Sequence, residues 1–266
     1  MKVTILGSGT SSGVPMPTCQ CEVCTSADPH DNRLRCSALV TTDEGRQILV
    51  DCGPDFRLQS IRADIRQLDA LLLTHNHFDH CYGLDDLRPW AYFKPLDTYA
   101  DRGMSQALLT RWDYIFVHKY PGVPKLMLHT LHPSQGDAFE VGDVTVTPIR
   151  CYHGKLPILG YRIGSLGYIT DCTCIDERDV PKLQGIDTLI IDALRWQPHP
   201  THYSVAQALD VVSRLQPRQT YFTHMSHDMG LHRDFPRRLR QEMGEAFPAS
   251  LLDTIHLAYD GLVINV

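Results

Sequence analysis

No apolar stretch in the sequence approaches the roughly 20 residues that a membrane-spanning helix needs, so we expect no membrane partner. The segment Met1–Gly9 resembles a strand and a glycine turn rather than a basic and then apolar secretion signal, which predicts a cytoplasmic protein. Serine-rich or proline-rich tracts and short tandem repeats are also missing, so nothing resembles a linker. These absences predict one continuous domain over residues 1–266.

Basic residues are outnumbered and scattered along the chain. The 25 Lys and Arg against 31 Asp and Glu give a formal net charge of -6, and no block of five or more basic residues occurs. A nucleic acid such as duplex DNA is therefore an unexpected partner. Intrinsic disorder of the whole chain is excluded, because 43% of the residues are hydrophobic and can form a core of ordinary size.

Strand-like segments open each half of the chain, and helix-like segments follow them. The predicted strands are Lys2–Leu6, Ser37–Thr42, Gln47–Cys52, Leu68–Thr74, Lys125–Leu131, Val144–Cys151, Ile158–Ile163, Tyr168–Thr170, Leu189–Ile191, Thr220–Thr223 and Ile255–Val266. The predicted helices are Gly83–Phe93, Arg102–Phe116, Ser204–Leu215 and Leu231–Met243. Two such halves predict an α+β protein, a four-layer αββα sandwich in which two packed sheets carry helices on their outer faces.

The strongest chemical signal is the segment His75-Asn76-His77-Phe78-Asp79-His80, which directly follows a buried-type strand. Residues two apart on an extended segment point the same way, so His75 and His77 can hold one metal ion together. Asp79 and His80 begin the next turn and can face a second ion. The alternative is a polar helix start that Asp79 caps, but histidines are mostly scattered in proteins and such clusters usually bind metal.

Three further candidate ligands, His153, Asp171 and His224, follow other predicted strands. An isolated histidine at a strand end is more often a hydrogen-bonded structural residue than a ligand, so none of them would be informative alone. A carboxylate can bridge two divalent ions, which makes Asp171 the natural shared ligand. The joint occurrence of these residues with the histidine-rich segment predicts a dinuclear metal site.

The His-X-His-X-Asp-His motif of this chain resembles that of the metallo-β-lactamase superfamily, and the resemblance covers nearly the whole sequence. It implies an αββα sandwich with two metal ions at one edge. The implied ligands are His75, His77 and His153 on the first ion, Asp79, His80 and His224 on the second, and Asp171 between them. With a histidine at position 80, the sequence resembles the phosphodiesterase and thioesterase branches of the superfamily. The lactamases commonly use a cysteine at the second ion, so antibiotic hydrolysis is not expected.

A cysteine cluster lies near the start of the chain, at Cys19, Cys21 and Cys24. Soft ligands at such short spacing suit a tetrahedral structural zinc, which needs one further ligand. His227 is the candidate, and zinc there would tie the N-terminal loop to the rim of the metal cleft. The alternative is three free thiols, because a Cys-X-Cys-X2-Cys run without a nearby fourth cysteine is less specific for zinc than two paired Cys-X2-Cys motifs.

The cysteine loop, the Thr-His-X-Ser-His segment at 223–227 and the His-X-Lys-Leu segment at 153–156 are together similar to the family of phosphoribosyl 1,2-cyclic phosphate phosphodiesterases of the carbon-phosphorus lyase pathway. This resemblance implies a structural zinc on the cysteines and His227, and a catalytic histidine that binds no metal, here His202. Lys155 is a candidate substrate contact. The segment Trp112–Pro124 has no counterpart in the family and suits a lid or a homodimer contact.

These observations predict a hydrolase with two Mn²⁺ or Zn²⁺ ions that cleaves a small phosphodiester, such as a phosphoribosyl cyclic phosphate. Asp79 would help to orient the attacking water, and His202 would act as a proton donor. A thioester or lactone hydrolase with the same metals is the main alternative. An RNase Z-like nuclease is disfavoured by the net charge, and a purely structural role of the metals by the dinuclear ligand set.

Overall fold

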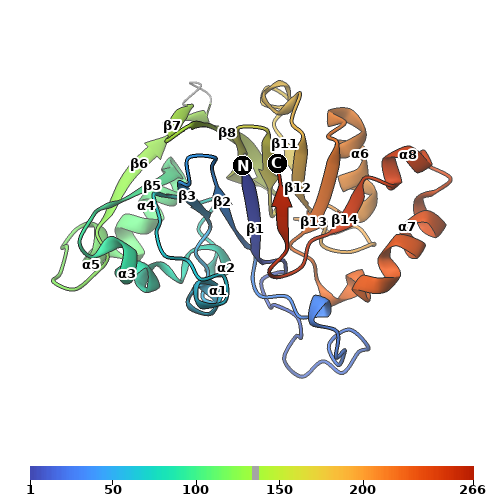
Figure 1. Ribbon diagram of the computed structural model, residues 1–266, viewed down its shortest axis with the longest axis horizontal. Coiled ribbons are helices and arrows are strands. Elements are labelled where there is room, and N and C mark those ends of the chain that lie inside the picture. The colour runs from blue at the N-terminus through green and yellow to red at the C-terminus, as the bar shows by residue number, and fades with distance from the viewer. Residues whose placement is uncertain (134–137) are drawn as a thin grey trace.

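The computed structural model describes residues 1–133 and 138–266, and within them two mixed β-sheets form (Figure 1). The first sheet has seven strands in the order β15, β1, β2, β3, β4, β5, β6. Their bounds are Val263–Asn265 (β15), Lys2–Gly7 (β1), Ser37–Thr41 (β2), Gln47–Val50 (β3), Ala70–Leu72 (β4), Leu96–Asp101 (β5) and Leu126–Leu131 (β6). The pairs from β15 to β3 are antiparallel, and those from β3 to β6 are parallel.

The second sheet has the order β11, β8, β9, β10, β12, β13, β14, and β7 pairs with β8. Its strands are Phe139–Val141 (β7), Val144–His153 (β8), Leu156–Ile163 (β9), Leu166–Ile169 (β10), Cys174–Ile175 (β11), Thr188–Asp192 (β12), Gln219–Thr223 (β13) and Ile255–Leu257 (β14). β10, β12, β13 and β14 run parallel, so the segments that leave β10, β12 and β13 emerge at one edge of the sheet.

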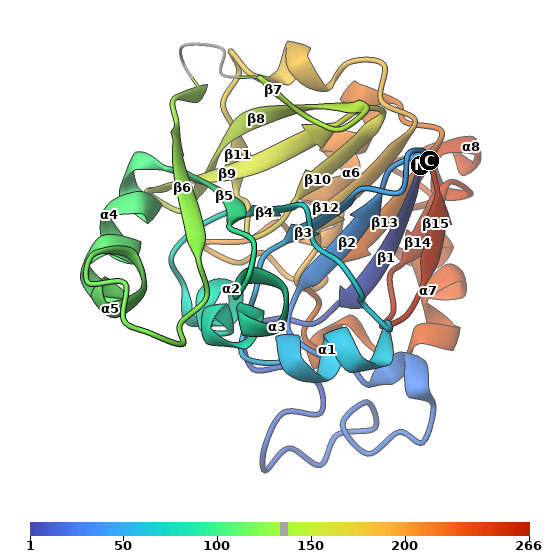
Figure 2. The same ribbon diagram turned by 60° about the vertical axis from the view of Figure 1, so that its left-hand side comes forward.

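Helices cover the outer face of each sheet, as Figures 1 and 2 show. Those on the first sheet are α1 (Phe56–Arg62), α2 (Phe78–Cys81), α3 (Arg88–Ala91), α4 (Arg102–Arg111) and α5 (Asp113–Phe116). Those on the second are α6 (Val205–Leu215), α7 (Phe235–Met243) and α8 (Ala249–Leu252). None of the helices within residues 1–133 and 138–266 is long and apolar enough to cross a membrane.

The strands alternate between two apolar layers because successive side chains point to opposite faces. Ile48 and Val50 of β3 pack between the sheets, whereas Leu49 packs under the helices of the first sheet. In β12, Ile190 points into the layer between the sheets, and Leu189 packs toward the helices of the second sheet. This arrangement gives three apolar layers between four structural layers, and it confirms the predicted αββα sandwich.

Several predicted helices are shorter or interrupted. The predicted helix 102–116 breaks at Trp112, which leaves helical geometry between α4 and α5. The predicted helix 231–243 begins only at Phe235, after a 3-10 turn, because Pro236 has no N–H to extend a helix backward. The predicted helix 83–93 likewise splits into a 3-10 turn and α3 before Pro89. Ser204 does cap α6 as predicted, in a capping box with Gln207.

Two glycines let the turn after β3 press directly on α2, which carries part of the histidine motif. A Cβ on Gly53 would stand 1.9 Å from the Asp79 carbonyl oxygen, and one on Gly83 would stand 2.1 Å from the Gly53 carbonyl oxygen. The contact is held by the Cys52 N–H, which donates to the His80 carbonyl at 2.8 Å. The backbone of the histidine motif is thus positioned by its close contact with the backbone at Gly53, and a larger residue at Gly53 or Gly83 would prevent this contact.

A Gly53→Ala substitution is expected to lower the free energy of unfolding by about 2 kcal/mol, because the new methyl group meets backbone that cannot move without displacing Asp79. Urea unfolding of the metal-loaded protein measures this loss. Gly103→Ala is the control, since its Cβ would be 3.5 Å from its nearest neighbour and the residue is helical. Equal stability of the two variants would contradict the prediction.

Candidate metal centre

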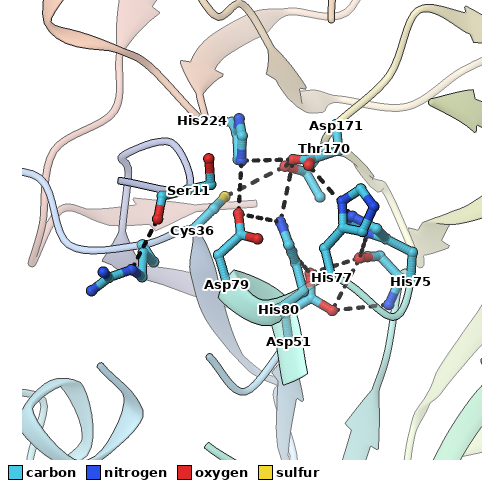
Figure 3. Close-up of polar contacts among 12 residues, drawn as sticks. Ser11, Cys36, Asp51, His75, His77, Asp79, His80, Thr170, Asp171 and His224 are labelled. Atoms are coloured by element: carbon cyan, nitrogen blue, oxygen red, sulfur yellow. Dashed lines mark hydrogen bonds and ion pairs between the residues drawn. The ribbon is translucent and has the colours of Figure 1, made fainter. Parts of the chain in front are cut away.

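Four side chains of the histidine motif and of two distant strand exits meet at one buried point. Asp79, His80, Asp171 and His224 each offer a ligand atom within 4.8 Å of the others. In Figure 3, dashed lines join these four side chains in a closed ring. The distances from His80 Nε2 to Asp79 and Asp171 are 3.1 and 3.3 Å, and those from His224 Nε2 are 3.4 and 2.8 Å. Donor atoms about 2.1 Å from one ion lie about 3.0–3.4 Å apart, so the spacing suits a metal.

A second group shares Asp171 with the first. His75, His77 and Asp171 place ligand atoms within 4.8 Å of one another, and the His75 Nε2 to Asp171 Oδ2 distance is 3.5 Å. A ligand atom of His153 lies within 4.8 Å of ligand atoms of Asp171 and His202, and His75 and His77 are not part of that group. The ring centroids of His153 and His77 are 5.1 Å apart. Asp171 therefore lies between the two groups, as a bridging ligand would.

The hydrogen bonds on the far side of these rings leave Nε2 free to face an ion. His80 Nδ1 lies 2.7 Å from Asp51, and His153 Nδ1 lies 2.7 Å from the Thr201 carbonyl, so both nitrogens donate. In the described part of the chain, His75 Nε2 and His80 Nε2 are buried without a hydrogen-bond partner. Ring nitrogens of this kind, held by an acceptor on the opposite side, are the usual metal-ligating histidines of proteins.

The charges of the cluster also fit a cation. Burial alone would raise the pKa of Asp79 and Asp171, but the imidazoles of His80 and His224 hold both values well below the ordinary range. Burial lowers the pKa of His75, His77 and His153, so their imidazoles are neutral and able to ligate. Two buried carboxylates therefore face a set of imidazoles, and a divalent ion can take the place of the protons that would otherwise balance them.

Asp51 is a supporting residue that sequence analysis missed. Its carboxylate is fully buried and accepts hydrogen bonds from His80 Nδ1 and from the Thr74 N–H and hydroxyl. Asp51 and two of the clustered residues, Asp171 and His224, adopt left-handed backbone angles, with φ of 60°, 51° and 56°. Such strain in residues other than glycine gathers at functional sites. An aspartate directly after a buried strand was the available signal.

His202 lies beside the cluster on the loop between β12 and α6, and it is 8% exposed. Its ring is 4.7 Å from the ring of His153 and stacks on His224 at 5.0 Å. The His202 Nδ1 lies 3.1 Å from Asp192 Oδ2. Asp192, at the end of β12, is a second carboxylate that the sequence analysis missed.

The predicted structural site also comes together. The Sγ atoms of Cys19, Cys21 and Cys24 lie 3.3, 3.3 and 3.6 Å from His227 Nδ1. Sulfur and nitrogen ligands of one tetrahedral zinc lie about 3.6 Å apart. The Cys24 N–H lowers the pKa of Cys21 to about 6, whereas burial raises the pKa of Cys24 to about 11. Cys24 therefore keeps a proton near neutral pH, and a bound cation would displace it.

Two other predicted positions lie outside these clusters. Lys155 is exposed in the turn between β8 and β9, two residues beyond His153. In the segment Trp112–Pro124, residues 119–124 line a cavity of about 590 Å³ together with Tyr92 and Phe93. As far as the described residues go, the lining includes none of the clustered histidines. The cavity is therefore separate from the metal centre.

Residues 46–225 match the family described as the beta-lactamase superfamily domain. The octanoyltransferase of Porphyromonas gingivalis is 42% identical over 264 residues, which make up 98% of this chain and 51% of that protein. The chain thus spans about half the length of that relative, so the relative's name by itself assigns no activity to the matched half. The coenzyme PQQ synthesis protein B of Methylobacterium radiotolerans is 28% identical over 226 residues, 72% of each protein.

Two solved structures show the same fold. A diphosphatase of the PhnP family superimposes with a TM-score of 0.86 and 38% identity, and the match covers 100% of this chain and 97% of that one. Zinc-bound PqqB from Methylobacterium extorquens superimposes with a TM-score of 0.77 and 22% identity over the full length of both chains.

Proposed function

Because the chain belongs to the beta-lactamase superfamily, whose fold holds divalent metals and serves hydrolases, we propose that it is a dinuclear metal-dependent phosphodiesterase. Its proposed substrate is a small phosphodiester such as a phosphoribosyl cyclic phosphate. The observation that carries the proposal is His202, a histidine beside the proposed metal ligands whose Nδ1 is already held by Asp192. A positioned imidazole of this kind suits an ester with a poor leaving group.

Two divalent cations, Mn²⁺ or Zn²⁺, would supply a low-pKa water as nucleophile and positive charge for the phosphoryl oxygens. We assign His75, His77 and His153 to one ion, Asp79, His80 and His224 to the other, and Asp171 to both. Asp79 would also help to orient the attacking water. As the phosphorus–oxygen bond breaks, His202 gives its proton to the departing alkoxide oxygen. Lys155 is assigned to the outer part of the substrate. Cys19, Cys21, Cys24 and His227 would hold a separate structural Zn²⁺.

A second candidate is a diphosphatase, favoured by the 38% identity with a diphosphatase over the whole chain. The two activities differ in the leaving group. A phosphate departs without a proton donor, whereas a sugar alkoxide needs one. A thioester or lactone hydrolase remains the alternative from acyl chemistry, because a dinuclear site polarises a carbonyl as well as a phosphoryl group.

Hydrolysis of bis(p-nitrophenyl) phosphate, a ribosyl cyclic phosphate, a diphosphate and a thioester tests the proposal, with protein of measured metal content. Diester cleavage that His77→Ala abolishes supports it. Turnover of the diphosphate without either diester would favour the second candidate, and turnover of the thioester alone would favour acyl chemistry.

The His202→Ala variant is expected to lose about 10²–10⁴-fold in kcat on the cyclic ribosyl phosphate, whose leaving group is an alkoxide, but less than about tenfold on bis(p-nitrophenyl) phosphate. The difference arises because p-nitrophenolate departs without a proton. Metal content by elemental analysis is the control and should match the wild type. Equal losses on both substrates would remove His202 from proton transfer.

A further inference from the structure

Asp192 stands at a junction between the proton donor and the metal cluster. It ends β12 and is fully buried. Its Oδ2 accepts a hydrogen bond from the Cys172 N–H at 2.9 Å and lies 3.1 Å from His202 Nδ1. Cys172 directly follows Asp171, the proposed bridging ligand. One oxygen of Asp192 therefore joins the loop of that ligand to His202.

The other side of Asp192 faces His224. β12 and β13 pair in parallel with Asp192 opposite Thr223, so the two strands leave the sheet side by side there. Asp192, His202 and His224 each offer an atom within 4.8 Å of the others. In the described part of the chain, Asp192 Oδ1 and His224 Nδ1 are both buried without a hydrogen-bond partner. Since His224 Nε2 faces Asp171 and Asp79, the proton of a neutral His224 ring belongs on Nδ1.

We propose that Asp192 is a positioning residue shared by the proton donor His202 and the metal ligand His224, an inference that rests on the phosphodiesterase proposed above. The Cys172 N–H and His202 Nδ1 already contact its Oδ2, and the proposal pairs its unpartnered Oδ1 with the unpartnered Nδ1–H of His224. Only a carboxylate accepts from all of them, because an amide of the same shape must turn an N–H₂ group toward one. Asp192 thereby keeps His202 Nε2 directed at the leaving oxygen and His224 Nε2 directed at the metal.

The first test compares leaving groups. Asp192→Asn is expected to lower kcat on the cyclic ribosyl phosphate about 100-fold and on bis(p-nitrophenyl) phosphate less than about tenfold. The double variant with His202→Ala should be less than about tenfold slower on the cyclic substrate than His202→Ala alone, because the larger part of the effect of Asp192 there acts through His202. Fully additive losses, or equal losses on both substrates, would overturn the assignment to His202.

The second test measures metal affinity rather than turnover. Competition of Zn²⁺ with a chromophoric chelator should show affinity at the weaker site about tenfold lower in Asp192→Asn and unchanged in His202→Ala. Unchanged affinity in Asp192→Asn would overturn the assignment to His224. Asp179→Asn is the matched control, since Asp179 is also buried but accepts from the Arg150 N–H and pairs with Lys182.

If the wild type cleaves no diester, the proposed phosphodiesterase fails while the metal titration still decides whether Asp192 supports His224. If Asp192→Asn does not fold, Asp192→Glu is measured in the same way. Its carboxylate is one methylene longer, so it should misplace His202 and reproduce the difference between the two leaving groups. Equal losses on both substrates, relative to the wild type, would contradict the proposal.

Discussion

Asp171→Asn is expected to lower kcat/KM for diester hydrolysis by about 10⁴-fold, which corresponds to about 5.5 kcal/mol of transition-state stabilisation. Asp171 is the carboxylate that both ligand groups share. Its oxygens lie 2.8 Å from His224 Nε2, 3.3 Å from His80 Nε2 and 3.5 Å from His75 Nε2. An amide removes the negative charge and turns an N–H₂ group toward at least one of these ring nitrogens, so neither ion is held as before.

Rates with bis(p-nitrophenyl) phosphate and metal content by elemental analysis check this expectation. At least one of the two proposed ions should be lost from the variant under conditions that load the wild type. Asp179→Asn serves again as a buried carboxylate outside the cluster and should keep both metal and activity. Activity within tenfold of the wild type at full metal content would refute a bridging role for Asp171.

The Cys21→Ser variant is expected to lose one equivalent of zinc and about 4 kcal/mol of stability, the contribution of a ligand present at a thousand times its Kd. The loop that carries the cysteines has little core of its own, with Val14 and Val23 as its buried aliphatic side chains between residues 11 and 33. Its attachment to His227 would therefore depend on the proposed zinc ion that they share. Hydroxyl replaces a thiolate poorly as a zinc ligand.

Urea unfolding and zinc stoichiometry measure the effect of Cys21→Ser. Cys174→Ser is the matched control because that cysteine is exposed and lies outside the cluster. Diester hydrolysis by the folded Cys21→Ser variant should fall much less than its stability, since the three thiols group with His227 and not with the histidines and aspartates of the candidate metal cluster. Full zinc content in the variant would mean that the three thiols are not ligands.

The histidine motif could be predicted because its chemistry lies within six consecutive positions. Two distant members of the cluster were accessible for a related reason: Asp171 and His224 directly follow segments that the hydrophobic pattern marks as strands. The layers of the fold were predictable because strand-like segments precede helices in both halves. These patterns are local in the chain, so they can be recognised without knowing how the strands pair.

Asp51 and Asp192 could not be predicted on the same grounds. Each is one aspartate at a strand end, which is also where caps and turns occur. Their roles depend on register, since Asp51 reaches Thr74 beyond the neighbouring strand and Asp192 lies opposite Thr223. The grouping of His153 with His202 and the break at Trp112 are likewise set by tertiary packing, which no spacing along the sequence reports.

The pairing of β1 with β15 places both chain ends side by side, as Figures 1 and 2 show, and the Val266 N–H donates to the Met1 carbonyl at 3.0 Å. The metal cluster lies toward the opposite end of β1, where Ser8 accepts a hydrogen bond from the Met225 N–H. A six-residue strand spans about 20 Å. A tag or second enzyme fused to either end would thus lie away from the candidate metal cluster, and the adjacent ends make the fold suitable for circular permutation.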